Sequence, residues 1–330
     1  MKILCFFEHF NPITNQEIET IKKYSDQYDL ILLYPENSAT EKKQINEMIS
    51  ICFSKYDNIT SDFEYYDLKE KINAKDIINK LKSNYSDASV SFLLLDGDNS
   101  AIIDEIVCNK IKLQINPISE ISYNDYEYEA RNLISLKCPI SIISYIVKNN
   151  LYFMVKINKY LDGKRLIHSI NVAELSYKIA LSNNLDNPDL YFIAGLLHDL
   201  GKHVSNKEKI SIMERFYRKF INIPSFSYHQ FAGAYKAKAL FPNLNDSVYK
   251  AILTHATGDS SMNLMQRIVY ASDKIEPSRG YDSTEMINLC LKNIEEGFIR
   301  VLKENIKFLI ASDCDIKNVL TDRCVNYYLN

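Results

Sequence analysis

The chain has 330 residues, which is enough for two ordinary domains and a sizeable hydrophobic core. Its net charge of −3 gives no basic field of the kind that binds nucleic acid, and no apolar run approaches the roughly 20 residues that span a bilayer. The opening MKILCFF soon meets acidic and polar residues, which favours a first strand over a signal peptide. The seven cysteines include no C-x-x-C pair, which suits reduced thiols in a cytoplasmic protein.

The first half alternates short apolar runs with helical patterns. The runs expected to form strands are Lys2–Phe7, Leu30–Tyr34, a stretch near Asp62–Asp67, Val90–Leu95 and a further stretch around 111–115. The helices expected between them lie near Asn15–Tyr24, Glu41–Phe53 and Ala74–Asn84. Continuous apolar strands between helices are typical of a parallel sheet covered on both faces. Residues 1–152 are therefore predicted to form an α/β domain.

The second half shows no strand alternation. Helices are expected at about 152–161, 165–182, 188–198, 207–220, 229–240, 245–256, 263–274 and 284–310. Residues 153–330 are therefore predicted to form an all-α domain. Residues 140–160 are nearly continuously apolar and leave only a short linker, so we expect the two domains to pack against each other.

A set of histidines and aspartates in this half falls where helices would carry the side chains inward. Of the chain's six histidines, four belong to it. A single histidine on an apolar stripe is ordinarily a core residue paired with a neighbour. Burying the whole set without compensation would cost several kcal/mol for each group, whereas a shared metal ion removes that cost. Imidazole and carboxylate together suit Fe, Mn, Co or Zn. This candidate ligand set consists of His168, His198, Asp199, His229, His255 and Asp273.

The candidate ligand set resembles the H…HD…D pattern of the HD superfamily of metal-dependent phosphohydrolases. The likeness narrows with RLIHS at 165–169, AGLLHDLGK at 194–202, YH at 228–229, THATG at 254–258 and YASDKIEPSR at 270–279. In this order the motifs are similar to the bacterial branch that cleaves diadenosine tetraphosphate symmetrically into two ADP. The similarity covers about residues 155–330. Asp259 departs from that branch, which usually has a basic residue there.

The resemblance implies a pair of divalent ions, with iron the first choice and Mn, Co or Zn as alternatives. The ligands implied for one ion are His168, His198, Asp199 and Asp273. The ligands implied for the second are His229 and His255, with Asp199 as the bridge. Such a pair activates a water for attack on phosphorus.

Other residues near these motifs are candidates for contact with the substrate. Lys202 follows His198 by one helical turn and is assigned, with Asp199, to the catalytic step. Arg279 can grip a phosphate through two hydrogen bonds. The full set of expected substrate contacts is Lys202, Arg279, Thr257 and Arg165.

The first half resembles a degraded nicotinate-mononucleotide adenylyltransferase. The segment KILCFFEHFNPITNQEI aligns with that family's GG-x-F-[ND]-P-x-H-x-G-H opening, of which F-N-P at 10–12 survives. The glycine pair corresponds to Phe7 and Glu8, and the catalytic histidines correspond to Thr14 and Glu17. LLLDGDN at 93–99 is similar to the family's acidic turn. The family's I-S-S-T-x-I-R motif starts at 121 or at 118, and its arginine is missing in either register.

These replacements are expected to remove the catalytic activity of the domain and to leave its fold intact. Adenylyl transfer needs imidazoles and backbone N–H groups against the charge of the triphosphate, and Glu17 adds negative charge there. Phe7 and Glu8 also place side chains where backbone should approach phosphate. We therefore expect this domain to be retained as a packing or docking partner without catalysis.

Three functions compete on this evidence. The first is metal-dependent hydrolysis of a dinucleoside polyphosphate, giving two ADP from diadenosine tetraphosphate. The second is a nicotinate-nucleotide adenylyltransferase in NAD biosynthesis, against which the missing histidines count. The third is a nucleotide-binding or regulatory protein, or an HD hydrolase of another phosphorylated nucleotide. The expected partner is a small nucleotide rather than nucleic acid or membrane, and a homodimer remains one candidate for the oligomeric state.

Overall fold

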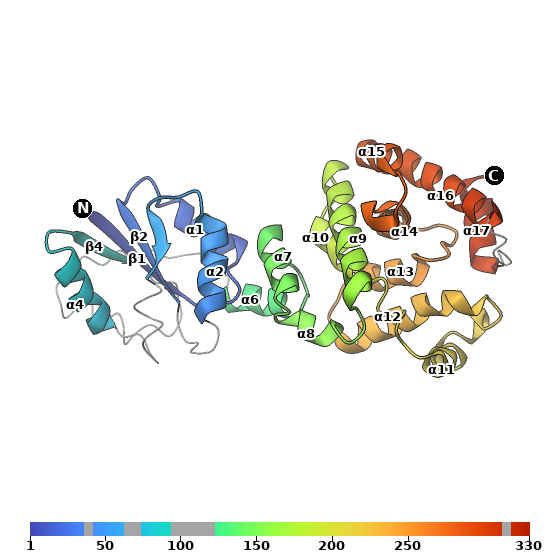
Figure 1. Cartoon of the computed structure of the whole chain (residues 1–330), viewed down its shortest axis with the longest axis horizontal. Coiled ribbons are helices and arrows are strands. Elements are labelled where there is room, and N and C mark those ends of the chain that lie inside the picture. Colours follow the sequence, from blue (N-terminus) through green and yellow to red (C-terminus); the bar gives the residue numbers. More distant parts are fainter. Residues whose placement is uncertain (36–41, 63–73, 94–122, 312–317) are drawn as a thin grey trace. The chain divides into compact units, whose positions relative to one another are not determined.

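The computed structural model describes residues 1–35, 42–62, 74–93, 123–311 and 318–330. The chain divides into two compact units, Met1–Arg131 with Leu136–Leu151, and Asn132–Ser135 with Tyr152–Asn330. Over the described residues, the strands belong to the first unit and the second consists of helices (Figure 1). The predicted order of an α/β domain followed by an all-α domain is confirmed.

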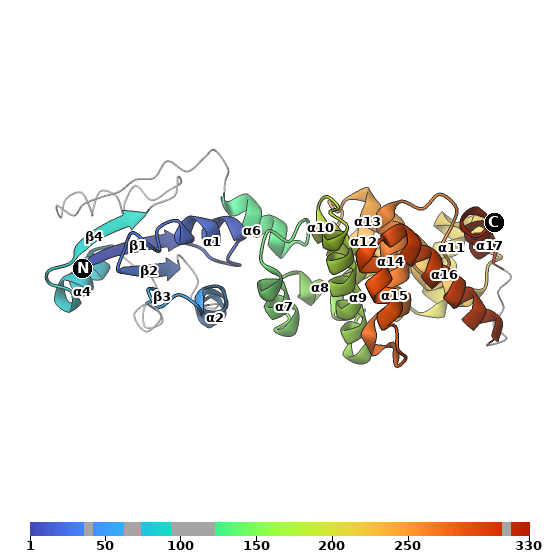
Figure 2. The same cartoon turned by 90° about the horizontal axis from the view of Figure 1, so that it is seen from above.

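The first unit is built on a parallel sheet of β1 (Lys2–Glu8), β2 (Leu30–Pro35), β3 (Ile59–Ser61) and β4 (Ser89–Leu93). The strand order is β3-β2-β1-β4 (Figure 2). The third strand lies earlier in the chain than the expected stretch near Asp62–Asp67, of which 63–67 lie outside the described residues. The expected strand at 111–115, the acidic turn at 94–99 and the start of the phosphate motif at 118–122 also lie outside them.

Helices flank these strands in the first unit. They are α1 (Asn15–Lys22), α2 (Lys42–Phe53), α4 (Ala74–Asn84), α6 (Tyr123–Arg131) and α7 (Ile140–Lys148). On one face of the sheet, Cys5 of β1 belongs to a buried cluster with Ile77 and Leu81 of α4. Leu4 and Phe6 point to the opposite face and are buried as well. Both faces are therefore covered, which explains why β1 is apolar throughout.

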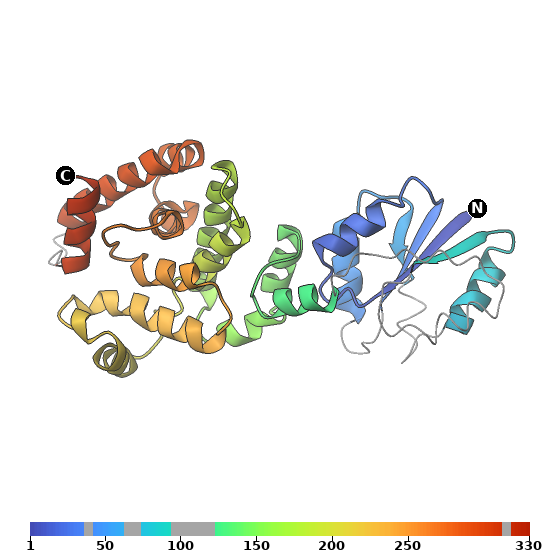
Figure 3. The same cartoon turned by 180° about the vertical axis from the view of Figure 1, so that it is seen from behind.

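The second unit is helical. Its helices are α8 (Phe153–Ile157), α9 (Gly163–Ser182), α10 (Pro188–Leu197), α11 (Asn206–Phe216), α12 (Tyr228–Leu240), α13 (Asp246–Thr254), α14 (Leu264–Ile275), α15 (Thr284–Lys292), α16 (Ile294–Ala311) and α17 (Val319–Tyr328). Short 3-10 turns occur at η1 (Arg218–Phe220), η2 (Ser225–Ser227) and η3 (Pro277–Arg279). Helix α14 lies inside this unit, packed against α9, α10, α13 and α16 (Figure 3). None of the described helices is long and apolar enough to cross a bilayer.

The structure differs from the sequence expectations for this unit at three places. The single helix expected at 284–310 is two helices, because Asn293 is extended and its side-chain oxygen caps the backbone N–H groups of Glu295 and Glu296. Helix α17 was not expected at all. The helix expected at 207–220 ends at Phe216 and is followed by the η1 turn.

Helices α9 and α10 cross closely, and this crossing brings their histidines together. A Cβ atom on Gly195 of α10 would lie 2.7 Å from the Cα of Ala173 in α9. Only glycine fits such a contact. His168 lies on α9, and His198 follows the last residue of α10. The close crossing therefore sets the separation of these two rings.

Candidate metal centre

The imidazoles of the candidate ligand set are oriented by hydrogen bonds at Nδ1. Each partner is a carbonyl or carboxylate oxygen, which can only accept, so every Nδ1 carries a proton. In a neutral ring the Nε2 lone pair is then available to a metal ion. The acceptors are Glu276 Oε1 for His168 (2.9 Å), Gly195 O for His198 (2.6 Å), Phe226 O for His229 (2.6 Å) and Ile252 O for His255 (2.7 Å).

Local structure explains most of these orientations. His198 and His255 are the C-cap residues of α10 and α13, where the last carbonyls of a helix lack backbone partners. Each ring bonds the carbonyl three residues before it. His229, near the start of α12, does the same with the η2 turn. Helix ends thus hold these rings in place before any metal ion binds.

The Nε2 atoms converge in two pairs. Those of His168 and His198 lie 3.3 Å apart, and those of His229 and His255 lie 3.0 Å apart. All four rings are buried. Facing lone pairs repel each other in a buried site, and a cation between them removes the repulsion. The arrangement of these rings therefore fits a metal centre.

Asp199 lies between the two histidine pairs. Its Oδ2 is 3.5 Å from His198 Nε2 and 3.9 Å from His168 Nε2. Its Oδ1 is 3.5 Å from His255 Nε2 and 3.7 Å from His229 Nε2. One carboxylate thus presents a separate oxygen to each pair, as a bridging ligand would.

Asp273 of α14 completes one side of the centre. Its Oδ1 lies 3.1 Å from His168 Nε2 and 3.6 Å from His198 Nε2. Ligand atoms of the set form three overlapping groups, each within 4.8 Å. The structure therefore brings together all the residues of the candidate ligand set, in a form compatible with a divalent metal ion.

The electrostatic environment of the candidate ligand set favours the protonation states that bind a metal ion. Burial would raise the pKa of Asp199, but His198 and His255 hold it well below its ordinary value. The pKa of Asp273 is likewise held well below its ordinary value against burial, chiefly by the charge of Lys274 and by the adjacent imidazoles of His168 and His198. Burial lowers the pKa of His255. Ionised carboxylates and neutral imidazoles are the forms that bind transition metals.

His198 shows the opposite tendency among the imidazoles. Burial acts to lower its pKa, yet the carboxylates of Asp199 and Asp273 raise it above the ordinary value. Positive charge is therefore favoured beside these carboxylates, and a metal cation supplies it.

A cavity of about 310 Å³ opens onto the centre, and the predicted substrate contacts line it. Arg165 Nη1 donates to Asp199 Oδ2 at 2.6 Å. The guanidinium of Arg279 donates to the backbone carbonyl of Asp273 at 2.7 Å and to its carboxylate.

The Thr257 hydroxyl is buried and hydrogen-bonded to Gln230 and to the carbonyl of Gly258. Thr257 is therefore the least available of these groups for a ligand.

Lys202 differs from the other cations around this cavity. Lys274 Nζ, like the two arginines, is paired with an aspartate, at 2.7 Å from Asp273 Oδ2. The ammonium of Lys202 has no hydrogen bond or ion pair with any residue that the structure describes. Burial lowers its pKa, although Asp199 and Asp273 act in the opposite direction. Lys202 is thus the cation most available to a phosphate.

Residues 165–278 match the family model described as HD domain. The second unit carries an HD domain. Over 349 aligned residues the chain is 26% identical to a "Probable nicotinate-nucleotide adenylyltransferase/Ap4A hydrolase" of Mycoplasma genitalium, covering 92% of this chain and 97% of that one. It is 29% identical over 174 residues to a "Bis(5'-nucleosyl)-tetraphosphatase, symmetrical" of Staphylococcus aureus, covering 51% of this chain and 88% of that one. Both resemblances noted in the sequence are confirmed.

A solved structure from Clostridium acetobutylicum, described as a predicted HD superfamily hydrolase involved in NAD metabolism, is 24% identical to this chain. Its TM-score is 0.47, and the match covers 54% of this chain and 95% of that one.

Some residues of the HD domain were given no role from the sequence. Glu276 is 1% exposed and accepts from His168, Asn171 and Ser278. Gln230 is fully buried and bonds the hydroxyl and backbone of Thr257. Glu276 follows Asp273 by three residues, so one helical turn places the two carboxylates on the same side. That spacing could have predicted a role for Glu276 near the candidate ligand set, whereas no sequence pattern indicated one for Gln230.

The loop of the first unit that corresponds to the adenylyltransferase opening is acidic. Glu17 accepts from Thr14 N and Oγ1 as part of a capping box at the start of α1. Burial raises the pKa of Glu17 well above its ordinary value, and Glu127 and Glu8 add to this. Ligand atoms of Glu8, His9 and Glu127 also lie within 4.8 Å of one another. Carboxyl groups, and not cationic groups, therefore lie where a triphosphate would need positive charge. Because its pKa is raised, Glu17 carries less negative charge than the sequence predicts.

Proposed function

We propose that the HD domain is a metal-dependent hydrolase that cleaves diadenosine tetraphosphate, or a closely related dinucleoside polyphosphate, into two ADP. The observation that carries the proposal is the position of Asp199, with one carboxylate oxygen toward each histidine pair. The HD domain and the names of the relatives support a hydrolase of this substrate class.

The candidate ligand set would hold two divalent ions. His168, His198 and Asp273 would bind one, His229 and His255 the other, and Asp199 both. We expect iron first, with Mn, Co or Zn as alternatives. Ions bound in this way supply Lewis acidity toward phosphoryl oxygens and activate water for attack on phosphorus.

The protein's own contribution is to position the phosphate chain and to balance its charge. Lys202 would contact a phosphoryl oxygen and stabilise the negative charge that develops as the leaving group departs. Arg165 and Arg279 already pair with the ligating aspartates, so they would orient those carboxylates and offer remaining N–H groups to phosphate.

The test is a product analysis with the purified full-length chain. The protein is loaded anaerobically with Fe²⁺, Mn²⁺, Co²⁺ or Zn²⁺ and incubated with diadenosine tetraphosphate in ¹⁸O-labelled water. ADP as sole product, with label in one ADP of each pair, supports the proposal. AMP with ATP would mean asymmetric cleavage, and no turnover with any of the metals would contradict a hydrolase of this substrate. The test variant is Asp199→Asn, which we expect to be inactive. The control is His203→Gln, a change at an exposed histidine, which we expect to be active.

The adenylyltransferase alternative has support in the name of the Mycoplasma genitalium relative, which aligns along most of this chain. The buried carboxylate of Glu17, where a catalytic histidine is expected, argues against it. ATP with nicotinate mononucleotide therefore should give no dinucleotide product. A panel of other phosphorylated nucleotides in the same hydrolysis assay tests an HD hydrolase of different specificity.

A further inference from the structure

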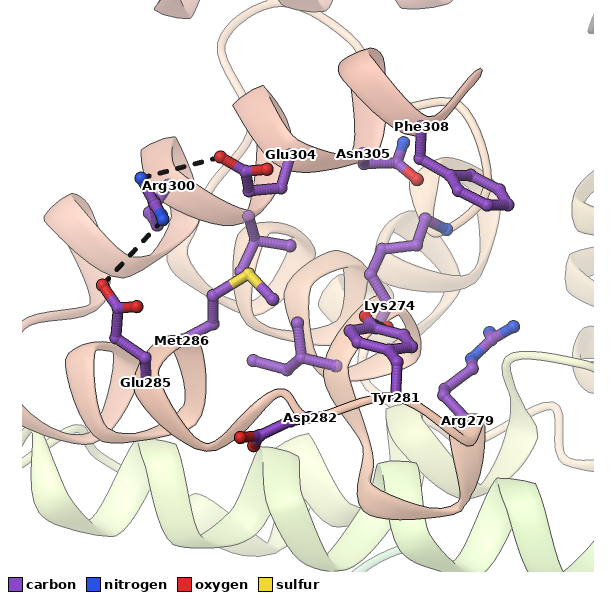
Figure 4. Close-up of a pocket in the computed structure, with 12 residues that line it drawn as sticks. Lys274, Arg279, Tyr281, Asp282, Glu285, Met286, Arg300, Glu304, Asn305 and Phe308 are labelled. Carbon is purple, nitrogen blue, oxygen red and sulfur yellow. Dashed lines mark hydrogen bonds and ion pairs between the residues drawn. The ribbon is translucent and has the colours of Figure 1, made fainter. Parts of the chain in front are cut away.

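A second cavity, of about 640 Å³, adjoins the cavity at the metal centre. It is bounded by the end of α14, the η3 turn and the facing sides of α15 and α16 (Figure 4). Lys274, Arg279 and Asn305 line both cavities. The two cavities therefore meet at these three residues.

The lining of the second cavity changes character along its length. Lys274 and Arg279 lie on one side together with the rings of Tyr281 and Phe308 (Figure 4). These rings are 48% and 66% exposed, which is high for large apolar groups in a concave site. The floor includes Met286 and other apolar side chains. Exposed rings beside an apolar floor are suited to a flat aromatic ligand.

The opposite side of the cavity is acidic. Arg300 pairs with Glu285 at 3.9 Å and with Glu304 at 3.6 Å (Figure 4). Asp282 lies on the cavity wall and accepts from the backbone of Thr284 at 3.0 Å. Carboxylates repel phosphate but accept hydrogen bonds from hydroxyl and amino groups. Charge therefore favours phosphate at the shared wall and a neutral, hydrogen-bond-donating group further in.

We propose that the second cavity binds the nucleoside part of the nucleotide whose phosphates lie at the metal centre. The base lies against the exposed rings of Tyr281 and Phe308, and the hydroxyl groups of the sugar or the amino group of the base donate to the carboxylates. Lys274 and Arg279 contact the phosphates at the junction of the two cavities. The cavity volume is within the range of about 300–1,000 Å³ typical of small-molecule sites. This assignment rests on the proposed function in that the ligand is a nucleotide.

The experiment compares ADP with inorganic pyrophosphate, which lacks the nucleoside. Binding of each to the full-length, Mn²⁺-loaded protein is measured by calorimetry for the wild type, Phe308→Ala and Tyr281→Ala. We expect ADP to bind the wild type more tightly than pyrophosphate. Phe308→Ala should weaken ADP binding about tenfold, within the range for loss of one base–aromatic contact. Its affinity for pyrophosphate should remain within about twofold of the wild type, which also shows that the variant is folded.

A matched control is Tyr327→Ala on α17. This ring is 58% exposed and lies outside both cavities, so its removal should leave ADP binding unchanged. Photolabelling with 8-azido-ADP provides a second measurement, with the label expected on peptides that cover 279–308. Unchanged ADP affinity in both cavity variants, or label confined to other peptides, would overturn the assignment.

Failure of this assignment and failure of the proposed function are distinguishable. If the wild type cleaves diadenosine tetraphosphate but Phe308→Ala and Tyr281→Ala bind ADP normally, the cavity assignment alone is wrong. If the wild type cleaves no such substrate yet ADP binding depends on Phe308, the assignment stands and the proposed reaction is wrong.

Discussion

The Nε2 atoms of His229 and His255 lie 3.0 Å apart, and the Nδ1–H group of each ring donates a hydrogen bond to a backbone carbonyl. Burial, with His255 and Lys202 nearby, holds the pKa of His229 well below its ordinary value, so protonation does not relieve the repulsion at neutral pH. A divalent cation bound by both atoms does. The free energy of folding should therefore depend on metal.

Metal binding should stabilise the HD domain. At a concentration 100 times the dissociation constant, Mn²⁺ adds about 2.7 kcal/mol per site to the free energy of unfolding. We expect the midpoint of thermal unfolding of the metal-free protein to rise by several degrees on addition of Mn²⁺. Ca²⁺ is the control, because it prefers all-oxygen sites. Equal midpoints with Mn²⁺, with Ca²⁺ and with no metal would count against a transition-metal site.

Glu276 should control metal affinity through His168. Its carboxylate accepts from His168 Nδ1 and from Ser278 N and Oγ. In Glu276→Gln one acceptor becomes an NH₂ donor, which conflicts with these donors and loosens the ring. Loss of such a partner typically weakens metal binding 10- to 100-fold, measurable by competition with a chelator. Glu174→Gln, on the same helix as His168, removes only an ion pair with Lys178 and should have no effect. Equal metal affinities for the two variants would show that Glu276 has no such role.

Lys202 should act on substrate rather than on metal. Because its ammonium pairs with none of the described residues while it lines the metal-centre cavity, Lys202→Met should leave metal content unchanged. We expect kcat/KM for diadenosine tetraphosphate to fall at least tenfold through loss of a charge-assisted hydrogen bond. Lys207→Met, at an exposed position on α11, is the control. A Lys202→Met variant with wild-type kinetics would remove Lys202 from the substrate contacts.

The first unit should lose stability as the pH rises. Burial raises the pKa of Glu127 from its ordinary 4.5 to about 7, and burial raises that of Glu17 as well. For a raised pKa, the contribution to stability is full below the unfolded value and is lost as pH rises through the folded value. For Glu127 this window runs from about 4.5 to about 7.

Calorimetric scans at pH 5.5 and pH 8 measure this effect. The wild type should unfold at the higher temperature at pH 5.5. Glu17→Gln keeps an acceptor for the capping box and should reduce the difference between the two pH values. Glu19→Gln, at an exposed position on the same helix, should not. The same difference in unfolding temperature between the two pH values in all three proteins would mean that these carboxyl groups do not make stability depend on pH.

The positions of the candidate ligand set could be predicted because helical periodicity and short motifs are local. His168 lies on the apolar stripe of α9, and His198 and His255 end their helices, all of which is visible in one sequence. The position of Asp199 between the two histidine pairs, in contrast, depends on contacts between segments distant in sequence. It depends on the close approach of the loop after α10 to α12, where a Cβ on Gly201 would collide with the His229 carbonyl.

What the sequence did not reveal depends on tertiary contacts. The break between α15 and α16 rests on Asn293, which periodicity alone reads as an ordinary helical position. Leu320 of α17 packs in a cluster with Met213 and Phe231, distant in sequence. The second cavity lies between α15, α16 and the η3 turn, so it is invisible until that break is known.

The most direct test of the central claim is elemental analysis of the purified, metal-loaded protein. The account predicts two equivalents of transition metal per chain for the wild type and for His203→Gln, about one for His255→Gln, and fewer than one for Asp199→Asn. A wild-type protein that retains no metal after removal of excess ions, or an Asp199→Asn variant that retains as much metal as the wild type, would contradict it.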